Sequence, residues 1–202
     1  MSEKVIKTVE QVIADYNADK ENEFSAGRRI VRHLINSGDS MKVDNDSYAD
    51  ALLLTSGMMS HAKRSFDVFV GEGVVGFLDT LKDDVERMLN RFKESFGKAR
   101  FIVLCKKAIP YLDALKQEYG IAFDYKTASL KQGYEKITEH FIVADNHMCR
   151  VEKPHAPITC SSPADVIKAE VSFNNTEIAQ FYTERFELYW KYLEDKQKSA
   201  KK

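Results

Sequence analysis

The sequence predicts an α/β protein in which a mixed sheet is flanked by helices and preceded by an N-terminal helical extension. Between residues 66 and 125, short runs of β-forming residues alternate with helical patterns. This β-α-β-α-β order is typical of a parallel sheet with helical crossovers. Residues 137–152 then read as strand, tight polar turn and strand, and this hairpin makes the sheet mixed.

The N-terminal part carries helical periodicity. Apolar residues at helical spacing predict helices over 3–18 and 24–36, and the second ends at Asn36-Ser37-Gly38-Asp39. A polar connection follows. Ser47 then caps a third helix that runs to about Arg64.

The central part alternates strands with helices. Its expected elements are a strand at 66–70, one long helix at 74–95, a buried strand at 101–105, a helix at 108–119 and a strand at 121–125. Pro110 fits the first turn of its helix and Gly120 ends it.

In the C-terminal part, the sequence predicts a strand at 166–173 and then a long helix capped by Asn174 or Asn175. Residues 196–202 read as a frayed basic tail. We therefore divide the chain into a helical extension over 1–46, an α/β domain over 47–195 and a tail over 196–202.

Composition narrows the class of protein. The 202 residues carry a formal net charge of -1, which argues against a general electrostatic nucleic-acid binder but leaves open nucleic-acid binding through a local basic patch. No segment approaches the roughly 18 to 20 apolar residues that cross a bilayer. The charged N-terminus does not read as a secretory signal. Three cysteines without a Cys-x-x-Cys pair argue against disulfides and against a zinc site, so we expect a cytoplasmic protein.

Gly71-Glu72-Gly73-Val74-Val75-Gly76 matches the Gly-x-Gly-x-x-Gly pattern between a strand and a helix. The acidic residue that binds a ribose is missing after the next strand, which ends Leu104-Cys105-Lys106-Lys107. Glu72 also places a negative charge where pyrophosphate lies. We interpret the segment as a flexible turn and expect no cofactor.

The hairpin carries the best candidate for chemistry. Thr138 and His140 share one strand face, because side chains alternate along a strand, and Asp145 lies at the turn. The register Thr138-x-His140-x-x-x-x-Asp145 resembles the His-x-Lys-x-x-x-x-Asp motif of the phospholipase D-like superfamily. The resemblance extends from about Tyr48 to Trp190 and includes the closing strand and helix.

The resemblance implies a single phospholipase D-like half with a degenerate motif. Thr138 falls on the nucleophilic histidine of that family, His140 on its lysine and Asp145 on its aspartate. The family's reaction needs an imidazole nucleophile and a cation for the phosphate, and Thr138 is no substitute without an activating base. A pair of Thr138 and His140 held by Asp145 is therefore the catalytic alternative.

Further polar residues surround this motif. Arg150, Glu152 and Lys153 either form an internal ion pair or line the ancestral anion pocket, and Arg150 is the best candidate for binding an acidic group. His147 is a further candidate ligand-binding residue. His147 and His155 could join His140 around a metal, but their spacing matches no recognised ligand set, so we predict no metal.

We therefore expect a non-catalytic, degenerate phospholipase D-like module that acts as a regulatory or accessory protein and binds a protein partner or an anionic ligand. The alternative is an active phosphodiesterase or nuclease with a rearranged site around Thr138, His140 and Asp145. Single-half members of the family pair two copies to build one site, so the resemblance also implies a homodimer.

Overall fold

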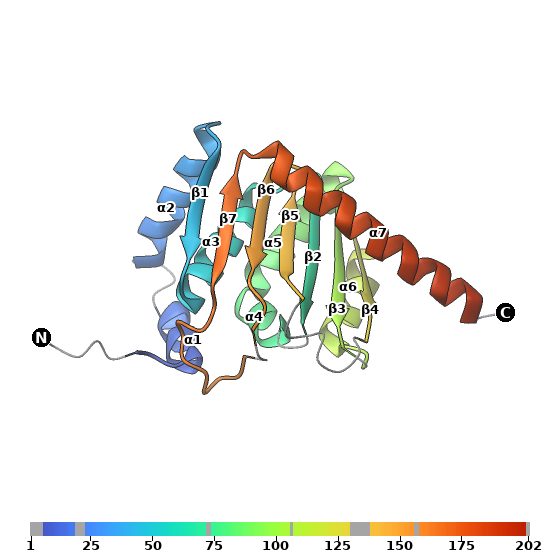
Figure 1. Ribbon diagram of the computed structural model, residues 1–202, viewed down its shortest axis with the longest axis horizontal. Helices are drawn as coiled ribbons and strands as arrows, with labels where there is room; N and C mark the ends of the chain where they lie inside the picture. The colour runs from blue at the N-terminus through green and yellow to red at the C-terminus, as the bar shows by residue number, and fades with distance from the viewer. Residues whose placement is uncertain are drawn as a thin grey trace, which may run out of the picture.

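The structure is a computed structural model that describes residues 6–18, 23–71, 74–105, 107–129, 138–155 and 158–200. Its strands are β1 (Met41–Asn45), β2 (Ser65–Gly71), β3 (Lys98–Leu104), β4 (Phe123–Thr127), β5 (His140–Ala144), β6 (Met148–Glu152) and β7 (Ala169–Phe173). They form one seven-stranded sheet in the order β1-β7-β6-β5-β2-β3-β4 (Figure 1).

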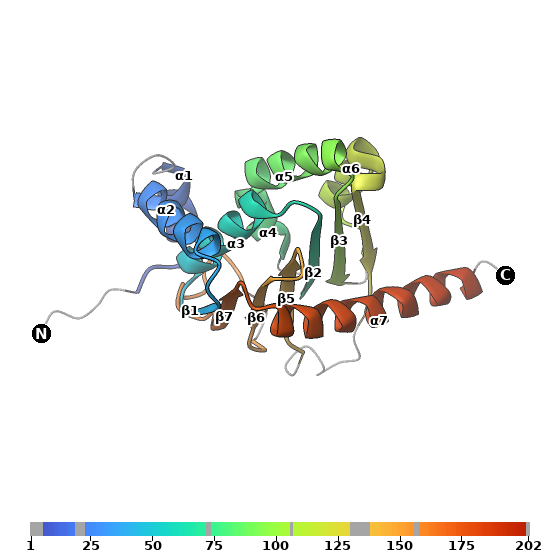
Figure 2. The ribbon, with the colours of Figure 1, turned by 90° about the horizontal axis from the view of Figure 1, so that it is seen from above.

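Helices cover both faces of this sheet. They are α1 (Val9–Ala18), α2 (Glu23–Asn36), α3 (Tyr48–His61), α4 (Val74–Thr80), α5 (Lys82–Ser95), α6 (Pro110–Tyr119) and α7 (Thr176–Ala200), with a 3-10 turn at Gly120–Ala122. Figure 2 shows α7 along one face of the sheet and α3 to α6 on the other.

The pairing of the strands confirms the predicted fold class. β2 pairs with β3 and β3 with β4 in parallel, as the alternation of strands and helices predicts. The hairpin of β5 and β6 is antiparallel, and β5 joins β2 in an antiparallel pair. The sheet is therefore mixed and flanked by helices.

Alternation along β5 and β6 directs side chains to two separate cores. Ile142 and Ala144 belong to the larger core beneath α3 and α5, whereas Phe141 and Val143 belong to the smaller core beneath α7. His140 precedes Ile142 by two positions, so it faces the same side as the larger core. This places its imidazole on the side of α3 and α4.

The edge strand β1 replaces the polar connection that the sequence predicts before Ser47. Lys42 and Asp44 of β1 are exposed, so the strand shows little hydrophobic signal. It forms because its backbone pairs with β7, for example Val43 opposite Val171. A strand that is stabilised by such long-range pairing cannot be predicted from the local sequence.

The prediction of one long helix over 74–95 is wrong, because the structure has two helices in this range. The chain turns at Leu81 and separates α4 from α5. The backbone N–H groups of Asp84 and Val85 both bond to the carbonyl of Leu81, which starts α5. Leu78, Leu81 and Val85 are all buried, so the turn lets both short helices pack on the sheet.

The two ends of the chain also differ from the expected elements. The first helix begins at Val9, because Thr8 and Gln11 cap it reciprocally through their backbone N–H groups and side-chain oxygens. Residues 1–5 lie outside the described part. At the other end, α7 is capped by Asn175, as predicted, and continues to Ala200 where the sequence predicts a frayed tail. Lys201 and Lys202 lie outside the described residues.

Candidate functional site

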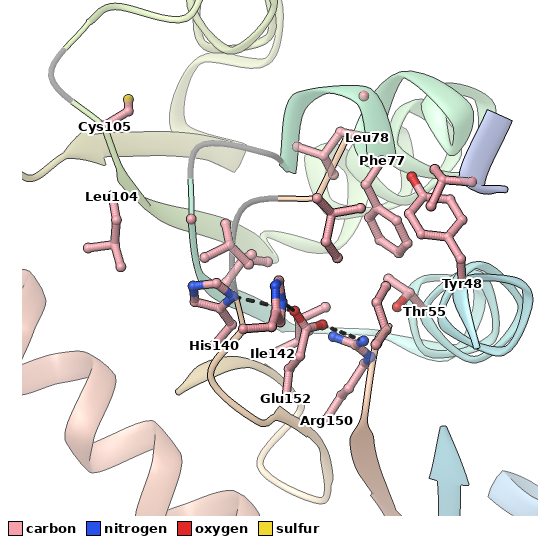
Figure 3. Close-up of a pocket in the computed structure, with 18 of the residues that line it drawn as sticks. Tyr48, Thr55, Phe77, Leu78, Leu104, Cys105, His140, Ile142, Arg150 and Glu152 are labelled. Atoms are coloured by element: carbon pink, nitrogen blue, oxygen red, sulfur yellow. Dashed lines mark hydrogen bonds and ion pairs between the residues drawn. The ribbon is translucent and has the colours of Figure 1, made fainter. Parts of the chain in front are cut away.

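A cavity of about 890 Å³ lies between the sheet and helices α3 and α4. Its walls are mostly apolar and include side chains of Met59, Phe66, Phe77, Leu104 and Ile142 (Figure 3). This volume falls within the roughly 300–1,000 Å³ of small-molecule sites. The cavity is therefore large enough for an organic ligand.

Four polar side chains gather at one wall of this cavity. His140 and Glu152 are directly opposite each other on β5 and β6, and His140 Nδ1 lies 3.4 Å from Glu152 Oε1. His155 Nε2 hydrogen-bonds to the same carboxylate oxygen. Arg150 Nη2 lies 2.5 Å from the other oxygen, Glu152 Oε2 (Figure 3). Glu152 thus links two imidazoles to one guanidinium.

The cluster is charged although it is largely removed from water. The side chains of His140, Glu152 and His155 are only 12%, 10% and 13% exposed. Burial opposes the charge on Glu152, but the Arg150 guanidinium and the hydrogen bonds from His140 and His155 hold the pKa of this carboxyl well below its usual range. Glu152 is therefore an ionised carboxylate at neutral pH.

Arg150 is held from behind by β1. Its Nε donates to Asn45 Oδ1 over 2.9 Å, and both residues are buried. The structure thus combines the two roles that the sequence offers for Arg150 and Glu152, because the two residues form an internal ion pair and also line the cavity.

Helix α3 contributes two polar groups to the cavity. Thr55 is fully buried, and its hydroxyl has no hydrogen-bond partner among the described residues. A buried hydroxyl without a partner is costly, so this position favours a ligand that bonds to it. Tyr48 lies nearby in Figure 3, and burial raises the pKa of its phenol, which stays neutral.

Gly71 is placed directly beside His140. A Cβ atom at Gly71 would lie 3.1 Å from Cε1 and 3.2 Å from Nε2 of His140. The first glycine of the Gly-x-Gly-x-x-Gly pattern therefore makes room for an imidazole of the cluster. Glu72 and Gly73 lie outside the described residues, and Gly76 is exposed on α4 with nothing close to it.

Asp145 lies at the opposite end of β2 from His140. Its carboxylate accepts hydrogen bonds from the backbone N–H groups of Lys63, Arg64 and Ser65, over 2.7 to 2.9 Å. These groups precede or begin β2, whereas Gly71 beside His140 ends it. His140 begins β5 and Asp145 directly follows it. Since a strand rises about 3.3 Å per residue, the five-residue step from His140 to Asp145 separates them by roughly 17 Å. The structure does not bring His140 and Asp145 together.

The other residues that the sequence singles out are dispersed. Thr138 is half-buried before β5 and does not line the cavity. His147 lies at the hairpin turn, where its Nδ1 bonds to the carbonyl of Asp145. Lys153 is exposed, and its backbone N–H bonds to Lys168. Of the predicted site residues, His140, Arg150 and Glu152 line the cavity.

The sequence carries only a weak signal for His155 as a site residue and none for Thr55. The signal for His155 is the spacing Glu152-x-x-His155, combined with the hairpin register that places His140 across from Glu152. No local signal marks Thr55, because it lies within an apolar helix whose orientation only the packed structure defines.

No protein-family model matches the sequence, and a search of curated proteins finds no match. Solved structures do resemble it. Nuc from Salmonella typhimurium, a phospholipase D family member, matches with a TM-score of 0.52 and 12% identity over 76% of this chain and 94% of that one. The chain has a phospholipase D-like fold.

A second likeness covers more of the chain. TrmBL2, an archaeal chromatin protein whose structure shows a novel mode of DNA binding, matches with a TM-score of 0.54 and 14% identity. The match covers 91% of this chain and 67% of TrmBL2. At these identities, both comparisons bear on the fold alone. Among the described helices, none is long and apolar enough to cross a membrane.

Proposed function

We propose that this protein is a phospholipase D-like module without phosphodiesterase activity, which binds a small molecule in the cavity and acts as a regulatory or accessory protein. The observation that carries the proposal is the cavity of about 890 Å³, with apolar walls and one polar wall around Glu152. Sites for small organic ligands combine apolar walls with a few placed polar groups in this way.

The chemistry of the lining suggests a ligand with an apolar body and one anionic group. Phe77, Leu104 and Ile142 offer surfaces for the apolar body. Lys107 also lines the cavity, along with His140 and His155, and these side chains can donate hydrogen bonds to an acid. Arg150 is already paired with Glu152, so we assign the anion to the lysine and the imidazoles.

Two residues, Thr138 and Asp145, support the proposed absence of phosphodiesterase activity. The sequence resemblance assigns Thr138 to the position of the nucleophilic histidine in phospholipase D-like enzymes. Asp145 accepts hydrogen bonds from three backbone N–H groups and lies roughly 17 Å along the strand from His140, too far to orient its imidazole. A general base acts within about 3.2 Å of the proton it removes. Both observations favour binding over turnover.

Two fluorescent probes of similar size test the proposal. Anilinonaphthalene sulfonate is anionic, and N-phenyl-1-naphthylamine is its uncharged counterpart. We expect saturable binding of one anionic probe per chain, tighter than that of the neutral probe. Leu104→Trp fills part of the cavity and should weaken binding at least tenfold. Leu188→Trp, the same change on an exposed position of α7, should leave it unchanged.

Such dyes also bind partly unfolded proteins. Each variant must therefore show a cooperative unfolding transition before it is titrated. Failure of the folded protein to bind either probe contradicts the proposal, as does full binding in Leu104→Trp.

Hydrolysis of bis(p-nitrophenyl) phosphate tests the catalytic alternative. We expect the protein to hydrolyse this substrate no faster than buffer alone does. Turnover that disappears in His140→Ala would instead establish the alternative, a phosphodiesterase or nuclease rearranged around Thr138, His140 and Asp145.

Three expectations about partners and location stay predictions. The homodimer implied by single-half phospholipase D-like proteins is checked by light scattering of the purified chain. A protein partner is checked by crosslinking in cells, and the cytoplasmic location by fractionation. DNA binding is a property of TrmBL2, and the net charge of -1 provides no general attraction to nucleic acid here.

A further inference from the structure

The cluster at the polar wall has the composition of a metal site. His140, Glu152 and His155 each offer one ligand atom, and these three atoms lie within 4.8 Å of one another. His140 Nδ1 and Glu152 Oε1 are 3.4 Å apart. Two ligands on a tetrahedral zinc ion with bonds of about 2.0–2.1 Å are separated by roughly 3.3 Å. One ion therefore fits between the imidazole and the carboxylate with little movement.

The backbone positions the three ligands together. His140 begins β5 and Glu152 ends β6, and the two are opposite each other in the antiparallel register. His155 follows three residues later, after the strand has ended. The two imidazole rings are 5.3 Å apart and nearly perpendicular, at 85°. Two ligands are thus fixed by the sheet, and the third lies on the segment that leaves it.

A second layer of contacts orients the carboxylate. Arg150 bonds to Glu152 Oε2, and Asn45 holds Arg150 in turn. This arrangement leaves Glu152 Oε1 directed at the two imidazoles (Figure 3). Hydrogen bonds to a ligating carboxylate are the usual support of metal sites in proteins. If the ion pair of Arg150 and Glu152 served stability alone, it would not need two histidines on the other carboxylate oxygen, Oε1.

We propose that His140, Glu152 and His155 bind one divalent transition-metal ion, with Zn²⁺ as the expected occupant. Two imidazoles and one carboxylate suit Zn²⁺, Co²⁺ or Fe²⁺, whereas Mg²⁺ and Ca²⁺ prefer sites built from oxygen. Three protein ligands leave at least one coordination position open, as in sites that take water or a ligand. All three residues line the cavity, so the open position faces it. The proposal does not depend on which organic ligand the cavity takes.

Metal titration of the 202-residue protein tests this inference. The protein is prepared without a histidine tag, stripped with a chelator and titrated separately with ZnCl₂, CoCl₂ and MgCl₂ by calorimetry. We expect one Zn²⁺ or Co²⁺ per chain and no binding of Mg²⁺. Bound Co²⁺ should also give the intense visible absorption of a four- or five-coordinate ion, which reports its ligands directly.

Two variants locate the ion. His155→Ala removes a ligand outside the strands and should weaken Zn²⁺ binding by more than the ~10- to 100-fold typical of outer contacts. His61→Ala is the matched control, since His61 ends α3 and bonds to the carbonyl of Gly57. It should keep full affinity. Absence of a stoichiometric site in the folded protein overturns the inference, and so does a His155→Ala variant that binds Zn²⁺ as tightly as the original chain.

Discussion

Asp145 accepts a hydrogen bond from the backbone N–H of Ser65, 80 residues earlier in the chain. The same carboxylate also bonds to the N–H groups of Lys63 and Arg64. It therefore ties the turn of the β5–β6 hairpin to the start of β2. Asp145, which the sequence resemblance assigns to the aspartate of the family motif, therefore has a structural role in this chain.

Asp145→Ala should lower the free energy of unfolding by about 1.5–3 kcal/mol, because three backbone donors lose a charged acceptor. Denaturant unfolding measures the change. Asn146→Gly is the control. Asp145 and Asn146 both have positive φ, and glycine adopts that conformation readily, so this variant should stay within about 0.5 kcal/mol of the original. Equal stability of Asp145→Ala and the original chain would contradict the structural role.

Arg100 joins the sheet to α7. It makes two hydrogen bonds of 2.8 Å to buried Asp67 and one of 2.6 Å to Glu187, and it lies over the rings of Phe186 and Trp190. Burial would lower the pKa of Arg100, but the bonds to Asp67 and Glu187 raise it. The guanidinium therefore stays charged at every pH at which the protein folds.

Arg100→Met should destabilise the protein by about 3–5 kcal/mol, because it leaves the Asp67 carboxylate buried without a counter-ion. Glu187→Gln removes a half-exposed partner and should cost less than about 1 kcal/mol. Urea unfolding monitored by Trp190 fluorescence compares the two variants. Similar losses for both would show that Asp67 does not depend on Arg100.

Gly71→Ala should weaken Zn²⁺ binding about tenfold while changing stability little, because its Cβ would press on the His140 imidazole. Calorimetry measures the affinity. Gly76→Ala provides the comparison, since nothing lies within 4 Å of its Cβ position in α4. Alanine is the better helix former by about 1 kcal/mol, so Gly76→Ala should gain stability and keep full affinity. Unchanged affinity in Gly71→Ala would refute the close contact.

Thr55→Val should raise the free energy of unfolding by about 1 kcal/mol in the absence of ligand, because it removes a buried hydroxyl without a partner among the described residues. Thermal unfolding of the purified protein measures this. A loss of stability would mean that the hydroxyl is satisfied, and would remove Thr55 from the polar groups offered to a ligand.

Local patterns in the sequence were sufficient for most of the elements. The β-α-β-α-β order correctly predicted the parallel strands β2, β3 and β4, and the Ser47 cap was correctly placed at the start of α3. The face of β5 that carries His140 was also correct, because side-chain alternation along a strand is a local property. β1 was missed since its stability comes from β7, which lies more than 120 residues away.

The candidate site, like the fold, has some features that the sequence determined and others that depend on tertiary packing. The sequence by itself determined the hairpin and the strand face that carries His140. The apposition of His140 and Glu152 came from the pairing register of β5 and β6, which was not predicted. Only the tertiary structure decided what that pair faces, because the cavity arises where α3 and α4 pack over the sheet. It also decided the partners of Asp145, since hydrogen bonds to a backbone 80 to 82 residues away depend on how the whole chain folds.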